Sequence, residues 1–557
     1  MNERYTIGID FGTLSARAVM VSADDGKEIA SAEKSYTSAV ICDKMPGSGE
    51  ILPPTWALQD PYDYTDALIY TVNEVMKSSG VPRDAVVGLG IDFTSSTVLP
   101  VYADGTPLCK ADRWKNERNA WVKLWKHHGG QRFADRINEI YNETGGDWLA
   151  HLGGKMSPES MPPKVWELYE EAPGAYADCD YIMEAGDWLD YLLTGNLTRS
   201  YQAAAYKAGY IEGRGYPSKE FLRLCDPGLE DFYGTKYCGT VVQTGSCIGT
   251  VRPEWAELLG LGKEVYVSAF TIDAHTCAMA LGLSGPGDAF GIFGTSNCYF
   301  LLSSSGENVP GINGCVKDGV IPGLYGYEAG LCCVGDHFAW LADGFTPEKY
   351  AEEARTLGLS PLQLLIRKAS ELRPGQSGLV ALDWWNGNRN ILLNADLSGL
   401  IVGMTLRTKP EEILRALIEA TAFGTRVIFD NYREHGIEIG SFIAAGGIPR
   451  KDPFTMQLFS DVLHMPIRVT ATKQAGAHGA AIGAAAAAGI WPDLGTAEEK
   501  MKVPVLAEYT PDPGAGRIYD RLYDEYVRLH DMFGRGGNDV MMRLRRISEQ
   551  SMKYGND

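Results

Sequence analysis

The 557-residue sequence lacks several features that would place it at once in a familiar class. No run approaches 18 apolar residues without a charge, and no apolar signal-peptide core follows Met1, so neither a membrane-spanning helix nor secretion is expected. The eleven cysteines are scattered, odd in number and without a CxxC pair, which indicates neither a disulfide framework nor a zinc ribbon. We therefore expect a cytoplasmic protein.

Positive charge is also scarce. The 51 Lys and Arg residues are outnumbered by 71 Asp and Glu residues, which leaves a formal net charge of -20 without a local basic patch. A chain of this charge repels nucleic acid and anionic lipid, so neither nucleic acid nor a membrane is expected as a partner. An anionic ligand would have to be held by backbone N–H groups or by a metal cation.

The common motifs of phosphate and hydrolytic chemistry are missing as well. The Walker pattern fails because Glu264 follows Gly262-Lys263 and Glu257 stands where the earlier glycine is required. No GxGxxG motif opens a helix after a strand, and neither a protein-kinase motif set nor a lipase-type nucleophile elbow occurs. The nine histidines include no HExxH motif.

What is present is typical of a large α/β protein. Hydrophobic residues make up 45% and charged residues 22% of the chain, and the 64 Gly and 28 Pro residues indicate many turns. Residues 111–193 are expected to be largely helical, and the Ala-rich run 477–491 predicts a buried helix. Helices are also expected at 62–77, at 411–432, after the N-cap Asp452 and finally at 515–532, with a frayed tail after Gly534.

A turn rich in Gly and hydroxyl groups, Asp10-Phe-Gly-Thr-Leu-Ser15, joins two strands expected at 5–9 and 16–21. Gly12 would let a phosphate approach the main chain, while Thr13 and Ser15 would add hydroxyl donors. Asp10, at the end of its strand, could hold Mg²⁺ through water. An ordinary hairpin with a capping Asp remains an alternative.

A second turn repeats the first about half the chain later. Ile292-Phe-Gly-Thr295 and the following Ser296 again join two expected strands, and this repeat predicts a duplicated architecture with two related domains that face one cleft. Gly294, Thr295 and Ser296 would form a second phosphate turn. Chance recurrence of Gly-Thr turns is the alternative.

Two further strand ends carry candidate site residues. Gly446 and Gly447 follow a strand and enter a helix, which suits close approach of a flat ligand such as a purine. Asp273, beside Ala274 and His275, could accept a proton from an attacking hydroxyl group. Its structural alternative is a helix N-cap for the residues from Thr276 onward.

The ordered set of motifs resembles one family. Asp10-Phe-Gly-Thr, Asp273-Ala-His275, Gly294-Thr-Ser296, Glu328-Ala-Gly330 and Ala445-Gly-Gly-Ile-Pro-Arg-Lys together resemble the FGGY carbohydrate kinases of the actin-like ATPase superfamily. The resemblance implies an α/β fold of two duplicated actin-like ATPase (ribonuclease H-like) domains, with a catalytic cleft between them. The N-terminal domain would span residues 1–284 and carry sugar binding, and the C-terminal domain would span residues 285–557 and bind the nucleotide.

Within that family, the stretches at 124–128, 322–330, 335–340 and 382–389 resemble the members that act on ribulose. The resemblance implies ATP-dependent phosphorylation of the C5 hydroxyl group of L-ribulose, with D-ribulose as a second candidate, in arabinose catabolism. ATP and Mg²⁺ are the implied cofactors. A homodimer is an open expectation.

The resemblance also assigns roles to residues. Asp273 would be the general base and contact the sugar, and Asp10 would help to place Mg²⁺. The sugar would meet Ser95, Ser96, Lys207 and Glu328, although Lys207 read alone suits a solvated loop and Glu328 a turn cap. The nucleotide would be held at its phosphates by Thr13, Ser15, Arg17, Gly294, Thr295 and Ser296 and beneath its adenosine by Gly446 and Gly447.

Two alternatives stay open. A kinase for another ketose or polyol, such as xylulose, ribitol or glycerol, would share these motifs, because one sequence does not reveal the sugar contacts. An actin-like or chaperone-like ATPase would share the nucleotide turns but not the need for Asp273 next to Ala274 and His275.

Overall fold

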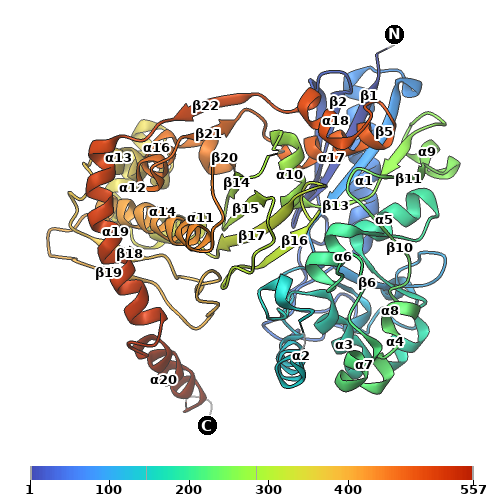
Figure 1. Ribbon diagram of the computed structural model, residues 1–557, viewed down its shortest axis with the longest axis horizontal. Coiled ribbons are helices and arrows are strands. Elements are labelled where there is room, and N and C mark those ends of the chain that lie inside the picture. The colour runs from blue at the N-terminus through green and yellow to red at the C-terminus, as the bar shows by residue number, and fades with distance from the viewer. Residues whose placement is uncertain (1–2, 146, 284, 555–557) are drawn as a thin grey trace. The chain divides into compact units, whose positions relative to one another are not determined.

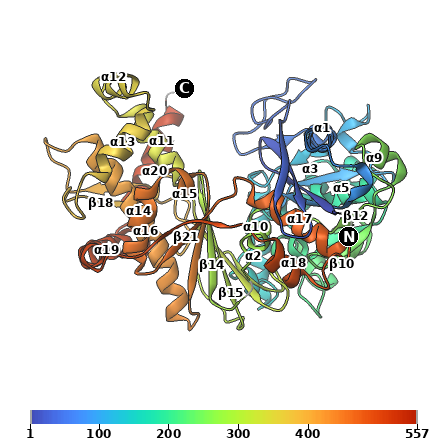
Figure 2. The same cartoon turned by 90° about the horizontal axis from the view of Figure 1, so that it is seen from above.

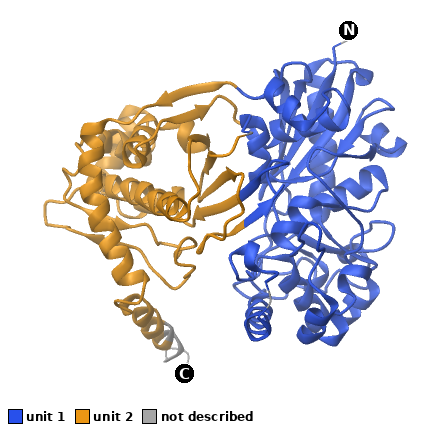
Figure 3. Ribbon diagram, in the orientation of Figure 1, with its two compact units in different colours: residues 1–284, 315–326, 474–503 blue, residues 285–314, 327–473, 504–557 orange. Residues whose placement is uncertain are grey.

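The computed structural model describes residues 3–145, 147–283 and 285–554. The chain forms two compact units (Figure 3): unit 1 comprises residues 1–284, 315–326 and 474–503, and unit 2 comprises residues 285–314, 327–473 and 504–557. Residue 284, where the sequence places the domain boundary, lies outside the described residues. Residues 315–326 and 474–503 belong to unit 1 although they follow that boundary in the chain.

A mixed sheet forms the centre of unit 1. Its strand order is β11-β12-β5-β1-β2-β3, with the short β13 also paired to β5. β1 runs antiparallel to β2 and parallel to β5, and β5 runs parallel to β12 and β13. The strands are β1 Tyr5–Phe11, β2 Ser15–Ser22, β3 Glu28–Ser35, β5 Val86–Phe93, β11 Cys247–Thr250, β12 Tyr266–Ser268 and β13 Thr271–Ile272.

A second mixed sheet has the order β16-β17-β15-β14-β20-β21-β22. β14 runs antiparallel to β15 and parallel to β20, β20 is parallel to β21, and β21 is antiparallel to β22. The strands are β14 Asp288–Phe293, β15 Asn297–Ser303, β16 Gly314–Lys317, β17 Tyr325–Leu331, β20 Ser441–Gly446, β21 Ile467–Thr470 and β22 Val505–Tyr509.

The two sheets follow one plan. The hairpin β1–β2 corresponds to β14–β15, and the parallel neighbours β5 and β12 correspond to β20 and β21. Each sheet ends on that side with an antiparallel strand, β11 in the first and β22 in the second. The duplicated α/β architecture predicted from the two Gly-Thr turns is therefore confirmed.

Helix α17 (Ala475–Ala487) packs closely on the first sheet, and the expectation of a buried Ala-rich helix is confirmed. A Cβ atom on Gly8 would lie 1.8 Å from the carbonyl oxygen of Ala477, and one on Gly90 would lie 2.1 Å from that of Ala480. Glycines on the strands and alanines on the helix thus let the two backbones meet. Figures 1 and 2 both show α17 beside α10 (Asp273–Leu281), with which it makes an extensive contact.

The rest of unit 1 combines helices with a small sheet of β4, β7, β6 and β8. The expectation of a largely helical 111–193 region is only partly correct, because 3-10 turns and the short strand β7 precede the helices. The elements are β4 Leu58–Gln59, α1 Pro61–Ser79, β6 Val98–Val101, β7 Val122–Lys123, α2 Gln131–Thr144, α3 Met161–Glu171, α4 Pro173–Asp178, β8 Tyr181–Glu184, α5 Ala185–Thr194, β9 Thr198–Ser200, α6 Tyr201–Lys207, α7 Lys219–Cys225, α8 Phe232–Thr235, β10 Thr240–Val242, α9 Pro253–Leu258 and α18 Leu494–Met501.

Helices dominate the rest of unit 2. The Asp452 carboxylate accepts a hydrogen bond from the Thr455 N–H (3.1 Å), as expected of an N-cap. The expectation of a frayed tail after Gly534 is wrong, because a further helix follows, and the N–H of its first residue, Val540, donates to Asn538 Oδ1 (3.0 Å). The helices are α11 Gly335–Gly344, α12 Glu348–Leu357, α13 Pro361–Ser370, α14 Pro410–Glu434, α15 Gly447–Lys451, α16 Pro453–Leu463, α19 Pro513–Gly534 and α20 Val540–Tyr554.

No helix within the described ranges combines the length and the apolar character that crossing a bilayer requires.

Candidate active site

Three carboxylates lie at one edge of the unit 1 sheet. Asp10 near the end of β1 stands opposite Asp92 on β5, and Thr271 on β13 stands opposite Asp92 from the other side. Asp273 follows two residues later as the first residue of α10. The carboxyl ends of these parallel strands therefore gather acidic groups where α/β proteins bind ligands.

Asp10 is held by a cation on the neighbouring strand. Arg17 lies with its Nη1 3.3 Å from Asp10 Oδ2 and with its Nε 3.2 Å from Glu33 Oε1. Burial raises the pKa of the Asp10 carboxyl group, while the Arg17 charge acts in the opposite direction. Ser15 donates its hydroxyl hydrogen bond to Glu33 (2.9 Å). The phosphate roles predicted for Ser15 and Arg17 thus involve side chains that already have partners within the sheet.

Asp92 was not among the residues selected from the sequence. Its side chain is fully buried, and neither carboxylate oxygen accepts a hydrogen bond from a described residue. Burial raises its pKa well above the ordinary value, and the charges of Asp10 and Asp273 add to the effect. The missed signal is a repeated tetrapeptide, since Gly8-Ile-Asp-Phe11 recurs as Gly90-Ile-Asp-Phe93.

The start of α17 lies beside this pair of acids. A Cβ atom on Gly476 would lie 3.0 Å from Asp92 Oδ2 and 3.5 Å from Asp10 Cγ. Only a glycine leaves that space between helix and carboxylates. The positive end of the helix dipole is therefore close to the two acids, which favours their charged forms.

Asp273 is not the N-cap of its helix. That position belongs to Ile272, and Asp273 is the first helical residue, where its Oδ1 accepts a hydrogen bond from the Ala274 N–H (2.7 Å). The hydroxyl group of Thr276 donates a hydrogen bond to Thr271 Oγ1 (2.6 Å). The alternative of an N-cap role is therefore wrong, while the role of general base stays a prediction.

The first phosphate turn is closed by its own backbone. Gly12 N–H donates to the carbonyl oxygen of Ser15 (3.1 Å). Trp125 donates its indole N–H to Thr13 Oγ1 (3.1 Å), and Gln59 donates its side-chain amide to the Thr13 carbonyl oxygen (2.7 Å). The position of Thr13 is thus fixed by side chains from outside the turn.

The predicted sugar residues of unit 1 lie at a turn and at a helix end. Ser95 and Ser96 lie between β5 and β6, and Ser96 has a positive φ of 51° and a buried hydroxyl group with no hydrogen bond to a described residue. Lys207 is the last residue of α6 and is half-buried, so the alternative of a solvated loop lysine is wrong. Burial raises the pKa of the Glu184 carboxyl group to about 8, and the positive charges of Lys164 and Lys207 act against this shift.

Glu328 lies in unit 2, within strand β17 and not at a turn, so a turn-capping role is wrong. Asn313 donates its side-chain amide to Glu328 Oε1 (3.3 Å). Asn390 in turn donates to Asn313 Oδ1 (3.1 Å) and accepts from the Gly330 N–H (2.7 Å). This set of amides orients the Glu328 carboxylate.

The second phosphate turn is also closed by its own backbone, but it is one residue shorter than the first. Gly294 N–H donates to the Ser296 carbonyl oxygen (3.1 Å), as Gly12 does to Ser15. Gly335, where α11 begins, donates its N–H to the Gly294 carbonyl oxygen (3.0 Å), and Val334 donates to that of Thr295 (2.8 Å). The turn is therefore joined to the start of a helix.

The glycine pair lies at the same edge of the second sheet. Gly446 stands opposite Phe293, the residue before Gly294, and has a positive φ of 106°. A Cβ atom there would lie 2.4 Å from the Phe293 carbonyl oxygen, whereas one on Gly447 would meet no atom within 4 Å. Gly446 is thus required by the backbone, and Gly447 opens α15 beside free space.

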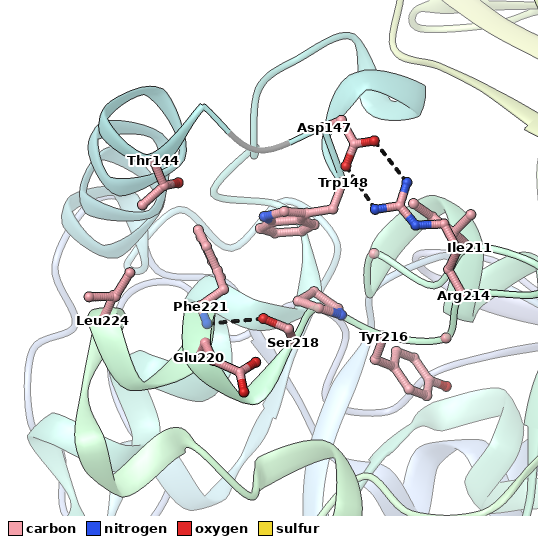
Figure 4. A pocket seen from close by; sticks show the side chains of 13 residues that line it. Thr144, Asp147, Trp148, Ile211, Arg214, Tyr216, Ser218, Glu220, Phe221 and Leu224 are labelled. Atoms are coloured by element: carbon pink, nitrogen blue, oxygen red, sulfur yellow. Dashed lines mark hydrogen bonds and ion pairs between the residues drawn. The ribbon is translucent and has the colours of Figure 1, made fainter.

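A cavity of about 390 Å³ lies elsewhere in unit 1 (Figure 4). Arg214 binds both oxygens of Asp147 at its rim, at 2.9 and 2.7 Å, and the Trp148 ring forms one wall. None of the predicted site residues is among those that line it.

The two matching sheets, each with a Gly-Thr-containing turn at the end of its first strand, define the class as a duplicated α/β protein with two mixed sheets of the same plan. Family models support this class in detail: the N-terminal domain of the FGGY family of carbohydrate kinases matches residues 5–280, and its C-terminal domain matches residues 289–488. The chain belongs to the FGGY family of carbohydrate kinases.

Individual relatives extend over nearly the whole chain. The sequence is 45% identical over 551 residues to a protein named ribulokinase from Halalkalibacterium halodurans, with 98% of each chain covered. It is 41% identical to a ribulokinase from Mycolicibacterium smegmatis, with 97% of this chain and 96% of the relative covered. Among solved structures, a xylulose kinase from Rhodospirillum rubrum is 24% identical with a TM-score of 0.77, covering 95% and 99% of the two chains, and shows the same fold.

Proposed function

We propose that the protein transfers the γ-phosphoryl group of ATP to the C5 hydroxyl group of L-ribulose, in arabinose catabolism, with D-ribulose as a second substrate. The observation that carries this proposal is the 45% identity to a ribulokinase over 98% of both chains. The solved sugar-kinase structures are too distant in sequence to choose the sugar, because the xylulose kinase shares only 24% identity.

The proposed mechanism is in-line phosphoryl transfer that depends mainly on positioning. Asp273, at the edge of the unit 1 sheet, accepts the proton of the attacking hydroxyl group, a role worth roughly 10²- to 10⁴-fold in rate. The turns at Gly12–Ser15 and Gly294–Ser296 present backbone N–H groups and hydroxyl groups to the phosphates. Gly446 and Gly447 lie beneath the adenosine.

The carboxylates of unit 1 suit a hard divalent cation. Asp10 and Asp92 offer oxygen ligands, and those of Asp92 accept no hydrogen bond from a described residue. We propose that Asp10 holds Mg²⁺ through water. Bound Mg²⁺ would supply charge neutralisation for the phosphates in a chain that has a net charge of -20 and no Walker lysine.

We assign sugar recognition to a positively charged side chain, a negatively charged side chain and two hydroxyl groups. Lys207, Ser95 and Ser96 of unit 1 and Glu328 of unit 2 would contact the hydroxyl groups of the pentose, since each desolvated hydroxyl group needs a donor or an acceptor. The amides of Asn313 and Asn390 that orient Glu328 support a fixed geometry for this contact.

The test is a substrate panel with ATP. Release of ADP is measured with L-ribulose, D-ribulose, xylulose, ribitol and glycerol, and kcat/KM is compared. The proposal expects stoichiometric ADP with ribulose and a kcat/KM at least tenfold above that for the other sugars. A preference for another sugar contradicts the proposed substrate, and ADP release without any sugar favours an actin-like or chaperone-like ATPase.

Three accompanying proposals need separate experiments. Loss of activity with EDTA and recovery with Mg²⁺ would support the metal. Cell fractionation would support a cytoplasmic location, and analytical ultracentrifugation would support a homodimer.

A further inference from the structure

A buried lysine beneath the predicted sugar turn forms no salt bridge with a carboxylate of the residues that the structure describes. Lys164 on α3 is 1% exposed, and its Nζ donates hydrogen bonds to three backbone carbonyl oxygens. These belong to Ser96 (2.6 Å), Leu124 (2.8 Å) and Trp125 (3.4 Å). The three donors of an ammonium group are thus matched by three acceptors from two separate segments of the chain.

Stability alone does not account for this ammonium group. Taking a charged group out of water is unfavourable, and an apolar side chain of similar volume is often as stable or more stable at a buried position. Burial also lowers the pKa of Lys164 to about 7, although the negative charge of Glu184 acts against this shift. The position of Lys164 is instead explained by the two chain segments whose carbonyl oxygens it binds.

The first segment that Lys164 joins is the turn at Ser95–Ser96. Ser96 has a φ of 51°, a left-handed conformation that residues other than glycine rarely adopt because it is strained. The hydrogen bond from Lys164 to the Ser96 carbonyl oxygen stabilises this conformation. The same turn is closed by a hydrogen bond between the hydroxyl groups of Thr94 and Thr97 (2.8 Å).

The second segment leads to the phosphate turn. Lys164 binds the carbonyl oxygens of Leu124 and Trp125, and Trp125 donates its indole N–H to Thr13 Oγ1 (3.1 Å). Lys164 thus joins the backbone of Ser96 to the backbone of Trp125, and the Trp125 side chain continues the connection to Thr13. All four residues belong to unit 1.

We propose that Lys164 is a positioning residue that fixes the sugar turn at Ser95–Ser96 relative to Trp125 and, through Trp125, to the phosphate turn at Thr13. This inference rests on the proposed function, because it takes Ser96 as a sugar contact and Thr13 as a phosphate contact. Small misplacements of reacting groups reduce rates by up to about 10²-fold, so such a link would have a measurable kinetic effect.

The first test compares Lys164→Met with Arg415→Met in the full-length protein. Arg415 in unit 2 is the control, because it is 2% exposed and also donates to backbone carbonyl oxygens, those of Ala369 and Leu372. Unlike Lys164, it also forms a buried ion pair with Glu419 (2.9 Å). Lys164→Met is expected to raise the KM for ribulose at least tenfold and to change the dissociation constant for ADP, measured by calorimetry, less than twofold. Arg415→Met is expected to lower the melting temperature without raising that KM.

The second test measures coupling. Trp125→Phe removes the indole N–H that binds Thr13 but keeps an aromatic ring. Independent effects of the two substitutions on kcat/KM would multiply. If the two residues act through one link, the double variant Lys164→Met/Trp125→Phe has a kcat/KM at least threefold higher than that product predicts. Should Lys164→Met not fold, Lys164→Gln, which keeps a neutral N–H donor, replaces it in both tests.

The outcomes separate the two proposals. A KM within twofold of the wild-type value in the folded Lys164 variant, an equal rise in Arg415→Met, or strictly multiplicative effects in the double variant each overturn the positioning role while the proposed function stands. If the wild-type enzyme prefers another sugar of the panel, the KM comparison is made with that sugar. A wild-type protein that phosphorylates no sugar overturns both proposals.

Discussion

Asp10 and Asp92 face each other on neighbouring parallel strands, at the same position of two identical tetrapeptides, Gly8–Phe11 and Gly90–Phe93, that pair residue by residue. The phenylalanines at the ends of these tetrapeptides stack with ring centroids 5.0 Å apart, and Gly8 and Gly90 both leave room for α17. One short sequence used twice therefore produces the acidic edge of unit 1 and the surface on which α17 packs.

The Mg²⁺ dependence of the reaction tests Asp10. Asp10→Asn removes the negative charge that would hold the hydrated cation, so the half-saturating Mg²⁺ concentration is expected to rise at least tenfold at fixed ATP. The measurement is a Mg²⁺ titration of initial rates. Asp66→Asn, at an exposed position on α1, is the control and should leave the titration unchanged. An unchanged midpoint in Asp10→Asn argues against the metal role.

Backbone contact between sheet and helix makes Gly8 sensitive to a single methyl group. Because a Cβ atom there would lie 1.8 Å from the Ala477 carbonyl oxygen, Gly8→Ala is expected to lower the free energy of unfolding by about 3 kcal/mol or more. The matched control is Gly234→Ala on α8, where an added Cβ atom meets nothing within 4 Å. Thermal and urea unfolding would measure both variants, and equal effects would contradict the packing argument.

The buried Glu184 makes stability depend on pH. Burial raises the pKa of its carboxyl group from 4.5 to about 8, so folding takes up a proton between these values and the wild-type protein loses stability as pH rises through that range. Glu184→Gln does not titrate. The free energy of unfolding of this variant should equal that of the wild-type protein near pH 4 and exceed it toward pH 8. A shift from 4.5 to about 8 limits the difference to about 5 kcal/mol, since each pH unit contributes about 1.4 kcal/mol.

Urea unfolding at several pH values measures this difference. Glu139→Gln on α2, which removes an acid whose side chain is 60% exposed, is the control and should show a pH-independent difference. A stability gain for Glu184→Gln that is the same at pH 4 and pH 8 would rule out the linkage.

Sugar affinity tests Glu328. Glu328→Gln keeps the shape and removes the charge that the Asn313 amide orients, so the KM for ribulose is expected to rise about tenfold. The dissociation constant for ADP should stay within twofold, since no nucleotide role is assigned to this residue. Steady-state kinetics and calorimetry give the two quantities, and a change confined to ADP binding would refute the assignment.

The local features of the fold were predictable from the sequence. The turns at Gly12 and Gly294 and the N-cap Asp452 are determined by neighbouring residues, and the structure has strands and a helix where these residues indicate them. The duplicated plan followed from the two Gly-Thr turns because each lies between the first two strands of its sheet.

Relations between distant residues were not predictable in the same way. Asp92 was missed because it lies within an apolar run and acquires its significance only when β5 pairs with β1. The segment 474–503 belongs to unit 1 because α17 packs on Gly8 and Gly90, a contact that spans several hundred residues. The role of Lys164 also depends on carbonyl oxygens from two segments that only the fold brings together.

We propose that Asp273 accepts the proton of the attacking ribulose hydroxyl group. The kcat for ATP-dependent phosphorylation of ribulose by Asp273→Asn and Asp273→Ala measures this role directly. Circular dichroism and ADP calorimetry first establish that both variants are folded and bind nucleotide. Because both variants lack the general base, their kcat is expected to fall by about 10²- to 10⁴-fold. A folded variant that phosphorylates ribulose at a rate near that of the wild-type enzyme would contradict this role.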